Sequence, residues 1–119
     1  MTETGRIGRL GEDAAARGLI KKGYIILERN FRLKTGEIDI VAMDKDGCTV
    51  FIEVKTRKNA DFGYACEFVD RKKQQKLIRT AEFYCGRDVY MRFDIIEVYY
   101  ELSESGIKIK EINHIENAF

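Results

Sequence analysis

The chain has 119 residues, of which 45% are hydrophobic and 34% are charged, and its formal net charge is +1. This composition excludes a disordered chain, a collagen-like repeat and a membrane-spanning protein. The length suits one hydrophobic core, so we expect residues 1–119 to form a single domain.

The pattern of apolar residues predicts an α/β protein with the element order αβββαββ. Ile7, Leu10 and Ala14 recur at the spacing of one helical face, and Gly23 is a suitable end for that helix. Runs of β-branched and aromatic residues predict the strands, and Asp70 is a suitable N-cap for the second helix. We expect helices over 6–22 and 70–85 and strands over 24–32, 36–43, 48–57, 92–100 and 107–112.

The turn between the second and third strands fixes how these strands pair. Asp-Lys-Asp-Gly at 44–47 suits a three-residue hairpin loop, with Gly47 in the left-handed conformation. This loop places Asp39 opposite Glu53. A two-residue loop would instead place Asp39 opposite Ile52, and the match of apolar residues favours the longer loop.

This register gathers ionisable side chains on one face of the predicted sheet. Glu37 then faces Lys55, and alternation puts both of them on the side of Asp39 and Glu53. Val41 and Phe51 share that face, which indicates that part of it is covered. The opposite face is expected to carry Ile38, Ile40, Ala42, Val50, Ile52 and Val54.

Two interpretations of this polar group compete. The first is a lattice of cross-strand salt bridges in which Glu37 pairs with Lys55. The second is a metal site, because two carboxylates that face each other offer hard oxygen ligands to Mg²⁺ or Mn²⁺. Lys55, two residues beyond Glu53, would then stabilise negative charge at a reacting phosphate. Glu-x-Lys is a weak signal alone and a stronger one beside Asp39 in matched register.

These motifs resemble the PD-(D/E)XK, or restriction-endonuclease-like, superfamily, and more closely the bacterial YraN family. Ile38 stands where a proline often precedes the aspartate in the superfamily. Archaeal Holliday junction resolvases within it share a helix-borne glutamate and the Asp, Glu, Lys arrangement. The blocks that carry the resemblance are Gly11-Glu12, Gly23-Tyr24, Arg29-Asn30, Gly36-Glu37-Ile38-Asp39-Ile40, Phe51-Ile52-Glu53-Val54-Lys55-Thr56-Arg57 and Arg92-Phe93-Asp94.

The resemblance implies a restriction-endonuclease-like αβββαβ core, in which helices flank a central mixed sheet. It also implies metal ligation by Asp39 and Glu53, a catalytic role for Lys55 and a supporting role for Glu12. On the helical wheel Glu12 lies at the border of the apolar face, where an exposed glutamate favoured by the helix dipole is an equal explanation. Glu37 is either a supporting partner of Lys55 or a direct ligand.

Basic residues follow the predicted catalytic strand. Residues 55–79 contain eight basic and three acidic side chains, whereas residues 94–119 contain six acids and two lysines. Such a basic run is either a solvated helix face or a surface that binds the phosphates of a nucleic acid. The expected nucleic-acid contacts are Arg57, Lys58, Arg71, Lys72, Lys73 and Lys76.

Other residues receive structural roles or none. The aromatic residues Phe62, Tyr64 and Phe68 are expected to cover the core rather than stack on bases. Three widely spaced cysteines, Cys48, Cys66 and Cys85, fit neither a disulfide framework nor a zinc site and are expected to be reduced. His114, placed in the tail after the last strand, has no visible partner in the sequence.

The sequence therefore predicts a Mg²⁺- or Mn²⁺-dependent endonuclease that acts on structured or branched DNA. The alternatives are a nucleic-acid-binding module on the same fold without catalysis, and a scaffold or homodimer that uses the sheet face as an interface. A homodimer is expected, since a chain of 119 residues offers a limited surface for duplex binding. No membrane partner is expected and the location is cytoplasmic, because the start of the chain lacks the apolar run of a signal peptide.

Overall fold

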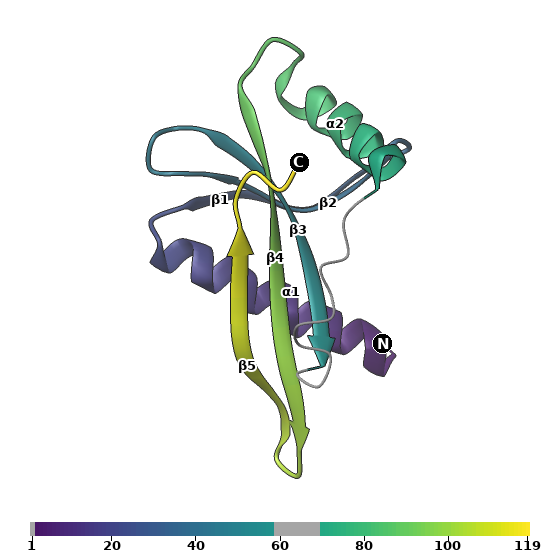
Figure 1. Cartoon of the computed structure of the whole chain (residues 1–119), viewed down its shortest axis with the longest axis vertical. Coiled ribbons are helices and arrows are strands. Elements are labelled where there is room, and N and C mark those ends of the chain that lie inside the picture. Colours follow the sequence, from purple (N-terminus) through teal and green to yellow (C-terminus); the bar gives the residue numbers. More distant parts are fainter. Residues whose placement is uncertain (1, 59–69) are drawn as a thin grey trace.

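A computed structural model describes residues 2–58 and 70–119 of the chain. These residues form a mixed five-stranded sheet with a helix packed on each face, as Figure 1 shows. The element order αβββαββ and the α/β class predicted from the sequence are confirmed. The elements are α1 (Glu3–Lys21), β1 (Ile25–Leu33), β2 (Gly36–Met43), β3 (Thr49–Lys58), α2 (Arg71–Cys85), β4 (Met91–Ser103) and β5 (Gly106–Ile115).

The strands lie in the order in which they occur along the chain. Their order is β1-β2-β3-β4-β5, and only the β3–β4 pair is parallel. A parallel pair requires a crossover connection, and α2 lies within the crossover from β3 to β4. No helix in the described part of the chain has both the length and the hydropathy that crossing a bilayer requires.

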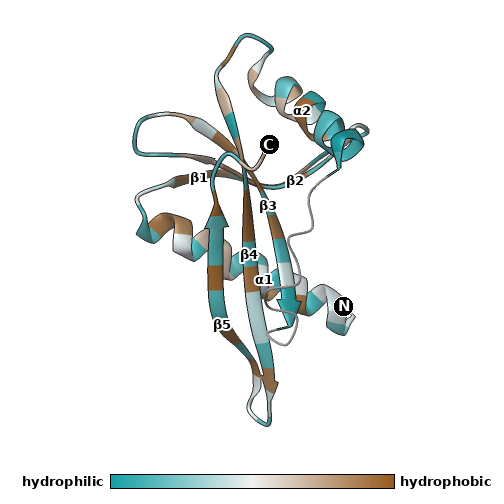
Figure 2. Ribbon diagram, in the orientation of Figure 1, coloured by the Kyte–Doolittle hydropathy of each residue, from teal (hydrophilic) through white to brown (hydrophobic). Residues whose placement is uncertain are grey.

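Each face of the sheet has its own apolar core. On one face, Ala14, Ala15 and Leu19 of α1 pack against residues such as Ile40 and Val50. On the other, Leu77 and Ala81 of α2 pack with Val41, Phe51 and Phe93. Figure 2 shows apolar residues along β3 and β4 at the centre of the sheet. Central strands that are buried on both faces explain why the sequence of β3 is apolar at consecutive positions.

Several boundaries differ from the sequence prediction. Helix α1 begins at Glu3 rather than at residue 6, because the Thr2 hydroxyl accepts a hydrogen bond from the Gly5 N–H (3.0 Å) and caps the helix. The first turn is polar, so apolar periodicity did not reveal it. Strand β5 extends to Ile115 rather than 112, which corrects the placement of His114 in a tail.

The predicted turn and strand register are confirmed. The Gly47 N–H donates to the Asp44 carbonyl oxygen (3.1 Å), and Gly47 has a φ of 85°. The Asp44 carboxylate also accepts from the Cys48 N–H (2.9 Å). Pairing then runs from Met43 opposite Thr49 to Ile40 opposite Ile52. The Asp-Lys-Asp-Gly turn therefore sets the register that directs Asp39 toward β3.

Beyond Ile40 and Ile52 the pairing of β2 with β3 ends, although both strands continue. We call this point the β2–β3 fork. The ladder therefore stops one pair short of Asp39 and Glu53, and the expectation that Asp39 lies opposite Glu53 and Glu37 opposite Lys55 is wrong. In Figure 1, β2 turns toward α2 beyond the fork while β3 continues beside β4.

The fork also changes which side chains share a face. Ile38 packs in the α2 core, whereas Ile40 packs in the α1 core. The prediction that Ile38 and Ile40 share a face is therefore wrong. On the neighbouring strand, Asn30 of β1 has a φ of 55° and lies between the pairs Arg29–Ile40 and Phe31–Ile38, so the backbone of β1 is irregular at the same level.

Some predictions concern residues 59–69, which lie outside the described part of the chain. These are the expectations for Cys66 and for Phe62, Tyr64 and Phe68. The other two cysteines, Cys48 and Cys85, are free thiols, in agreement with the prediction. Burial raises the pKa of both thiols, which makes them less reactive at neutral pH.

Candidate active site

Asp39 lies at the β2–β3 fork with other acids nearby. Its Oδ2 accepts a hydrogen bond from the Val54 N–H (2.8 Å). This side-chain hydrogen bond joins β2 to β3 where the backbone pairing ends. Burial raises the pKa of Asp39 to about 6; the Val54 hydrogen bond lowers it, and the charges of Glu12, Glu53 and Glu37 raise it further. Four carboxyl groups therefore share one electrostatic environment.

Glu53 on β3 has two oxygens in different situations. Oε1 accepts a hydrogen bond from the Lys73 Nζ (2.7 Å). Oε2 is buried and has no hydrogen-bond partner among the described residues. A buried carboxylate oxygen without a donor is costly, and a cation would offset that cost. The chemistry of these carboxylate oxygens fits a hard divalent ion, although no three of the acids Glu12, Glu37, Asp39 and Glu53 have ligand atoms that all lie within 4.8 Å of one another.

Glu12 reaches the sheet from α1. It is half-buried and accepts hydrogen bonds from the Arg29 Nε (3.2 Å) and from the Asn30 Nδ2 (3.1 Å). Gly11 makes the close approach of α1 possible, because a Cβ at this position would lie 2.0 Å from Thr56 Oγ1 on β3. The helix therefore directs Glu12 toward Asp39 rather than toward open solvent.

Glu37 on β2 and Lys55 on β3 have different neighbours. Glu37 forms an ion pair with Arg32 of β1 (3.2 Å). Lys55 is half-buried, two residues beyond Glu53, and is in register with the buried Glu97 of β4. Alternation along β3 keeps Lys55 on the face of Glu53.

Two open clefts meet at Asp39. The α1 cleft has a volume of about 1020 Å³, and Glu12, Arg29 and Arg32 are among the residues that line it. The α2 cleft has a volume of about 520 Å³ and is lined by Glu53 and by lysines of α2. Asp39 and Glu37 line both clefts. The acidic group is therefore accessible from the side of either helix.

The structure divides the predicted nucleic-acid contacts into two groups. Lys72, Lys73 and Lys76 line the α2 cleft beside the acids. Arg71, in the same first turn of α2, is exposed but does not line that cleft among the described residues. Arg57 and Lys58 end β3, roughly 13 to 17 Å along the strand from Glu53.

Sequence analysis missed the side chains that hold the acids in place. Arg29 and Asn30 hold Glu12, and Lys73 holds Glu53. The available signal was Asn30 inside a run of strand-forming residues, because asparagine tolerates the left-handed conformation that interrupts a strand. Nothing in the sequence indicated which lysine of the basic run would contact Glu53.

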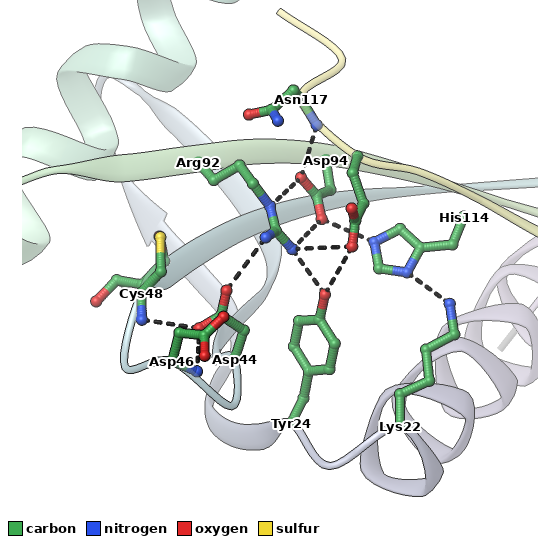
Figure 3. A network of polar contacts seen from close by, with 11 residues as sticks. Lys22, Tyr24, Asp44, Asp46, Cys48, Arg92, Asp94, His114 and Asn117 are labelled. Carbon is green, nitrogen blue, oxygen red and sulfur yellow. Dashed lines mark hydrogen bonds and ion pairs between the residues drawn. The ribbon is translucent and has the colours of Figure 1, made fainter.

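A second polar network surrounds Asp94, as Figure 3 shows. Asp94 is fully buried, and its two oxygens accept hydrogen bonds from the Arg92 Nε and Nη2 (both 2.9 Å). His114 Nε2 also contacts Asp94 (2.7 Å), and its Nδ1 contacts the Lys22 Nζ (2.9 Å). The expectation that His114 has no partner is therefore wrong. It was missed because its partner lies 20 residues away on β4.

This network includes a group of possible metal ligands. Among the described residues, Asp94, His114 and Glu116 form the one set of three whose ligand atoms all lie within 4.8 Å of one another. The guanidinium of Arg92 already pairs with both carboxylates of this set, because its Nη2 lies 2.9 Å from Asp94 and 3.6 Å from Glu116. The set is therefore better explained as an internal ion network than as a metal site.

Residues 11–98 match the model of a family described as "Uncharacterised protein family UPF0102". The chain belongs to this family. UPF0102 is the YraN family, so the resemblance to that family found in the sequence is confirmed. A UPF0102 protein of Caldanaerobacter subterraneus is 47% identical over 117 residues, which cover 95% of this chain and 93% of that protein. One from Clostridioides difficile is 47% identical over 116 residues, covering 94% of this chain and 95% of that protein.

Two solved structures are similar to parts of this UPF0102 chain. A repair endonuclease from Pyrococcus abyssi has a TM-score of 0.40 and 18% identity, and the match covers 78% of this chain and 38% of that chain. The EndoMS–dsDNA2 complex has a TM-score of 0.40 and 14% identity, with coverages of 75% and 34%. The UPF0102 chain thus spans less than two fifths of either protein.

Proposed function

We propose that this UPF0102 protein is a divalent-metal-dependent endonuclease that hydrolyses phosphodiester bonds in structured or branched DNA. The observation that carries the proposal is the acidic group at the β2–β3 fork. Asp39 has a pKa raised to about 6, and Glu53 has a buried oxygen without a donor among the described residues. Excess negative charge of this kind, open to two clefts, favours a site for Mg²⁺ or Mn²⁺.

Each residue of the site would have a separate role in the reaction. Asp39 and Glu53 would hold the ion, and Arg29 and Asn30 would orient Glu12 beside them. When bound, the ion would lower the pKa of a coordinated water and neutralise charge on the scissile phosphate. Lys55 would stabilise the negative charge that develops on that phosphate.

The binding surface would adjoin these groups. Lys72 and Lys76 line the α2 cleft and would contact phosphates on either side of the scissile bond. Glu37 would support the site from its ion pair with Arg32. We expect the protein to act as a homodimer, which light scattering would test.

The experiment is a cleavage assay over single-stranded, duplex, flap and four-way-junction DNA, with Mg²⁺, with Mn²⁺ and with EDTA. We expect cleavage of at least one structured substrate with either metal and none with EDTA. The Glu53→Gln variant, purified in the same way, is the control for a contaminating nuclease. Cleavage at the parental rate by Glu53→Gln would reject this site.

The second candidate function is a nucleic-acid-binding module without catalysis. It is favoured by the lysines of the α2 cleft, which can bind phosphates whether or not chemistry follows. Tight binding across the panel, together with no cleavage in any metal, would select this function over the first.

A further inference from the structure

We infer that Lys73 is an exchange cation, which neutralises Glu53 when no metal is present and turns to a substrate phosphate when a divalent ion binds. This role rests on the proposed function, and it adds that metal binding and nucleic-acid binding are coupled. The ion and the nucleic acid would each favour the binding of the other, because both depend on where one ammonium group lies.

The contact between Lys73 and Glu53 supports this role. The Lys73 Nζ lies 2.7 Å from Glu53 Oε1, and the Glu53 side chain is only 17% exposed. Lys73 is therefore a positive charge already placed at a proposed ligand of the ion. Lys72 and Lys76 line the same cleft, but neither forms an ion pair with an acid in the described ranges 2–58 and 70–119.

The backbone of Lys73 is fixed while its side chain can move. Its N–H donates to the Asp70 Oδ1 (2.8 Å), which caps the first turn of α2. The side chain is 50% exposed, and the four-carbon stem of lysine lets the ammonium reach more than one partner. Movement of Lys73 between Glu53 and a phosphate therefore requires no change in the helix.

The sequence of α2 also indicates that its lysines serve a role other than helix stability. Arg71, Lys72 and Lys73 occupy the first turn, which contains no acidic residue. Positive charge at a helix N-terminus opposes the helix dipole and is unfavourable for helix stability. Glu53 offsets this cost for Lys73 in the absence of metal.

Competition for Glu53 has a measurable consequence. An ion pair with one partner half exposed contributes less than about 1 kcal/mol, so its loss would change a competing affinity by up to about 5-fold. Reciprocity requires that the ion increase DNA affinity by the same factor by which DNA increases the affinity for the ion. Removing the ammonium of Lys73 should reduce this coupling.

The test compares Lys73→Gln with Lys72→Gln, a neighbour in the same cleft. Titration calorimetry without DNA measures the Mn²⁺ affinity of each metal-free protein. We expect Lys73→Gln to bind Mn²⁺ about 2- to 5-fold more tightly than the parent, and Lys72→Gln to differ from it by less. Lys73→Arg, which keeps the charge, should restore an affinity near that of the parent.

A second measurement uses a phosphorothioate-substituted four-way junction, which resists cleavage. Its affinity is measured at fixed ionic strength with EDTA and with Mn²⁺. Mn²⁺ should strengthen binding by the parent and by Lys72→Gln more than binding by Lys73→Gln. Thermal melting of each variant shows that it is folded.

The outcomes separate this inference from the proposed function. If the parent binds no Mn²⁺, the proposed metal site fails. If the parent binds Mn²⁺ but Lys73→Gln binds it as Lys72→Gln does, or more weakly than the parent, the exchange role of Lys73 is overturned while the metal site stands.

Discussion

The environment of Asp39 disfavours the ionised form of its carboxyl group, so the effect of Asp39 on stability depends on pH. Its pKa is raised from 3.8 to about 6, first by burial and then by the charges of Glu12, Glu53 and Glu37 against the Val54 hydrogen bond. A carboxyl group with a raised folded-state pKa binds more protons when folded than when unfolded. Its ionisation therefore costs nothing below pH 3.8 and lowers stability as the pH rises through 6.

We expect the Asp39→Asn variant to be more stable than the parent at neutral pH. The advantage should be near zero at pH 4, grow as the pH rises to 6 and level off above it, at about 3 kcal/mol. Asparagine can still accept the Val54 hydrogen bond, so the substitution mainly removes the charge. Urea unfolding in EDTA across this pH range measures the difference.

An advantage of Asp39→Asn that does not vary with pH would contradict this account of the acidic group. Saturating Mn²⁺ provides a further check. The ion should stabilise the parent and not the variant, and so reverse their order of stability.

Substitutions of Lys55 and of Glu53 should affect cleavage and DNA binding in different ways. Lys55→Ala should abolish cleavage while DNA affinity changes little, because one cation among many adds little to binding but acts where charge develops. Glu53→Gln should also abolish cleavage, yet DNA binding should persist or tighten as repulsion between carboxylate and phosphate falls. Single-turnover cleavage and fluorescence anisotropy separate the two effects. Parental cleavage rates in both variants would place the chemistry elsewhere.

At the scale of elements, the approach of α1 to β3 depends on one glycine. An alanine Cβ at position 11 would lie 2.0 Å from Thr56 Oγ1 and 2.9 Å from Thr56 Cβ, and a short β-branched side chain cannot move away easily. Glu12 follows directly in the sequence, so any shift of the helix also moves a member of the acidic group.

We expect Gly11→Ala to lower the free energy of unfolding by about 1 to 3 kcal/mol through overpacking. Gly8→Ala is the matched control, since a Cβ there meets nothing within 4 Å. That variant should gain about 0.5 to 1 kcal/mol from higher helix propensity. Urea unfolding measures both, and equal stabilisation by the two alanines would show that α1 is free to move away from β3.

The elements also show how far sequence reasoning reaches. The turn at 44–47 was predictable because its residues determine the local backbone, and the register of β2 and β3 followed from it. The fork was not predictable, because alternation of apolar and polar residues continues through Ile38 and Ile40 although the pleat does not. The left-handed Asn30 lies at the same level on β1, and a rule applied along β2 alone cannot include the neighbouring strand.

The site shows the same limit. The pairing of β2 with β3 as far as Ile40 and Ile52 followed from the turn, whereas the contact of Glu12 with Arg29 depends on how α1 packs on the sheet. The contact of Lys73 with Glu53 depends on the placement of α2 after the crossover. Both depend on the packing of helices on the sheet, which a strand register does not determine.

At the scale of the whole molecule, the Arg92 network connects distant parts of the chain. Arg92 contacts Asp44 of the β2–β3 turn (3.1 Å) and Tyr24 between α1 and β1 (2.6 Å), and Asp94 accepts from the Asn117 N–H (3.1 Å). Burial alone would raise the pKa of Asp94. The hydrogen bonds from His114, Arg92 and Asn117 outweigh it and hold that pKa below its usual range.

We expect Arg92→Met to lower the free energy of unfolding by about 3 to 5 kcal/mol, because it leaves the charge of Asp94 buried without its cation. Chemical unfolding at pH 7 measures the loss. The lowered pKa of Asp94 implies that its stabilisation is present above pH 3.8 and is lost as the pH falls through the folded-state value. The gap between parent and variant should therefore shrink in strong acid, and a loss below 1 kcal/mol at pH 7 would show that the network is dispensable.

The order of the strands leaves β1 and β5 as the two margins of the sheet. Lys108, Lys110 and Glu111 are exposed along β5, and Glu28, Arg29 and Arg32 are exposed along β1. Charged side chains on a marginal strand oppose the addition of a further strand from another molecule. These charges therefore disfavour growth of the sheet into a continuous ten-stranded one by pairing between two copies, although Ile25 and Leu27 on β1 and Ile112 on β5 are exposed as well.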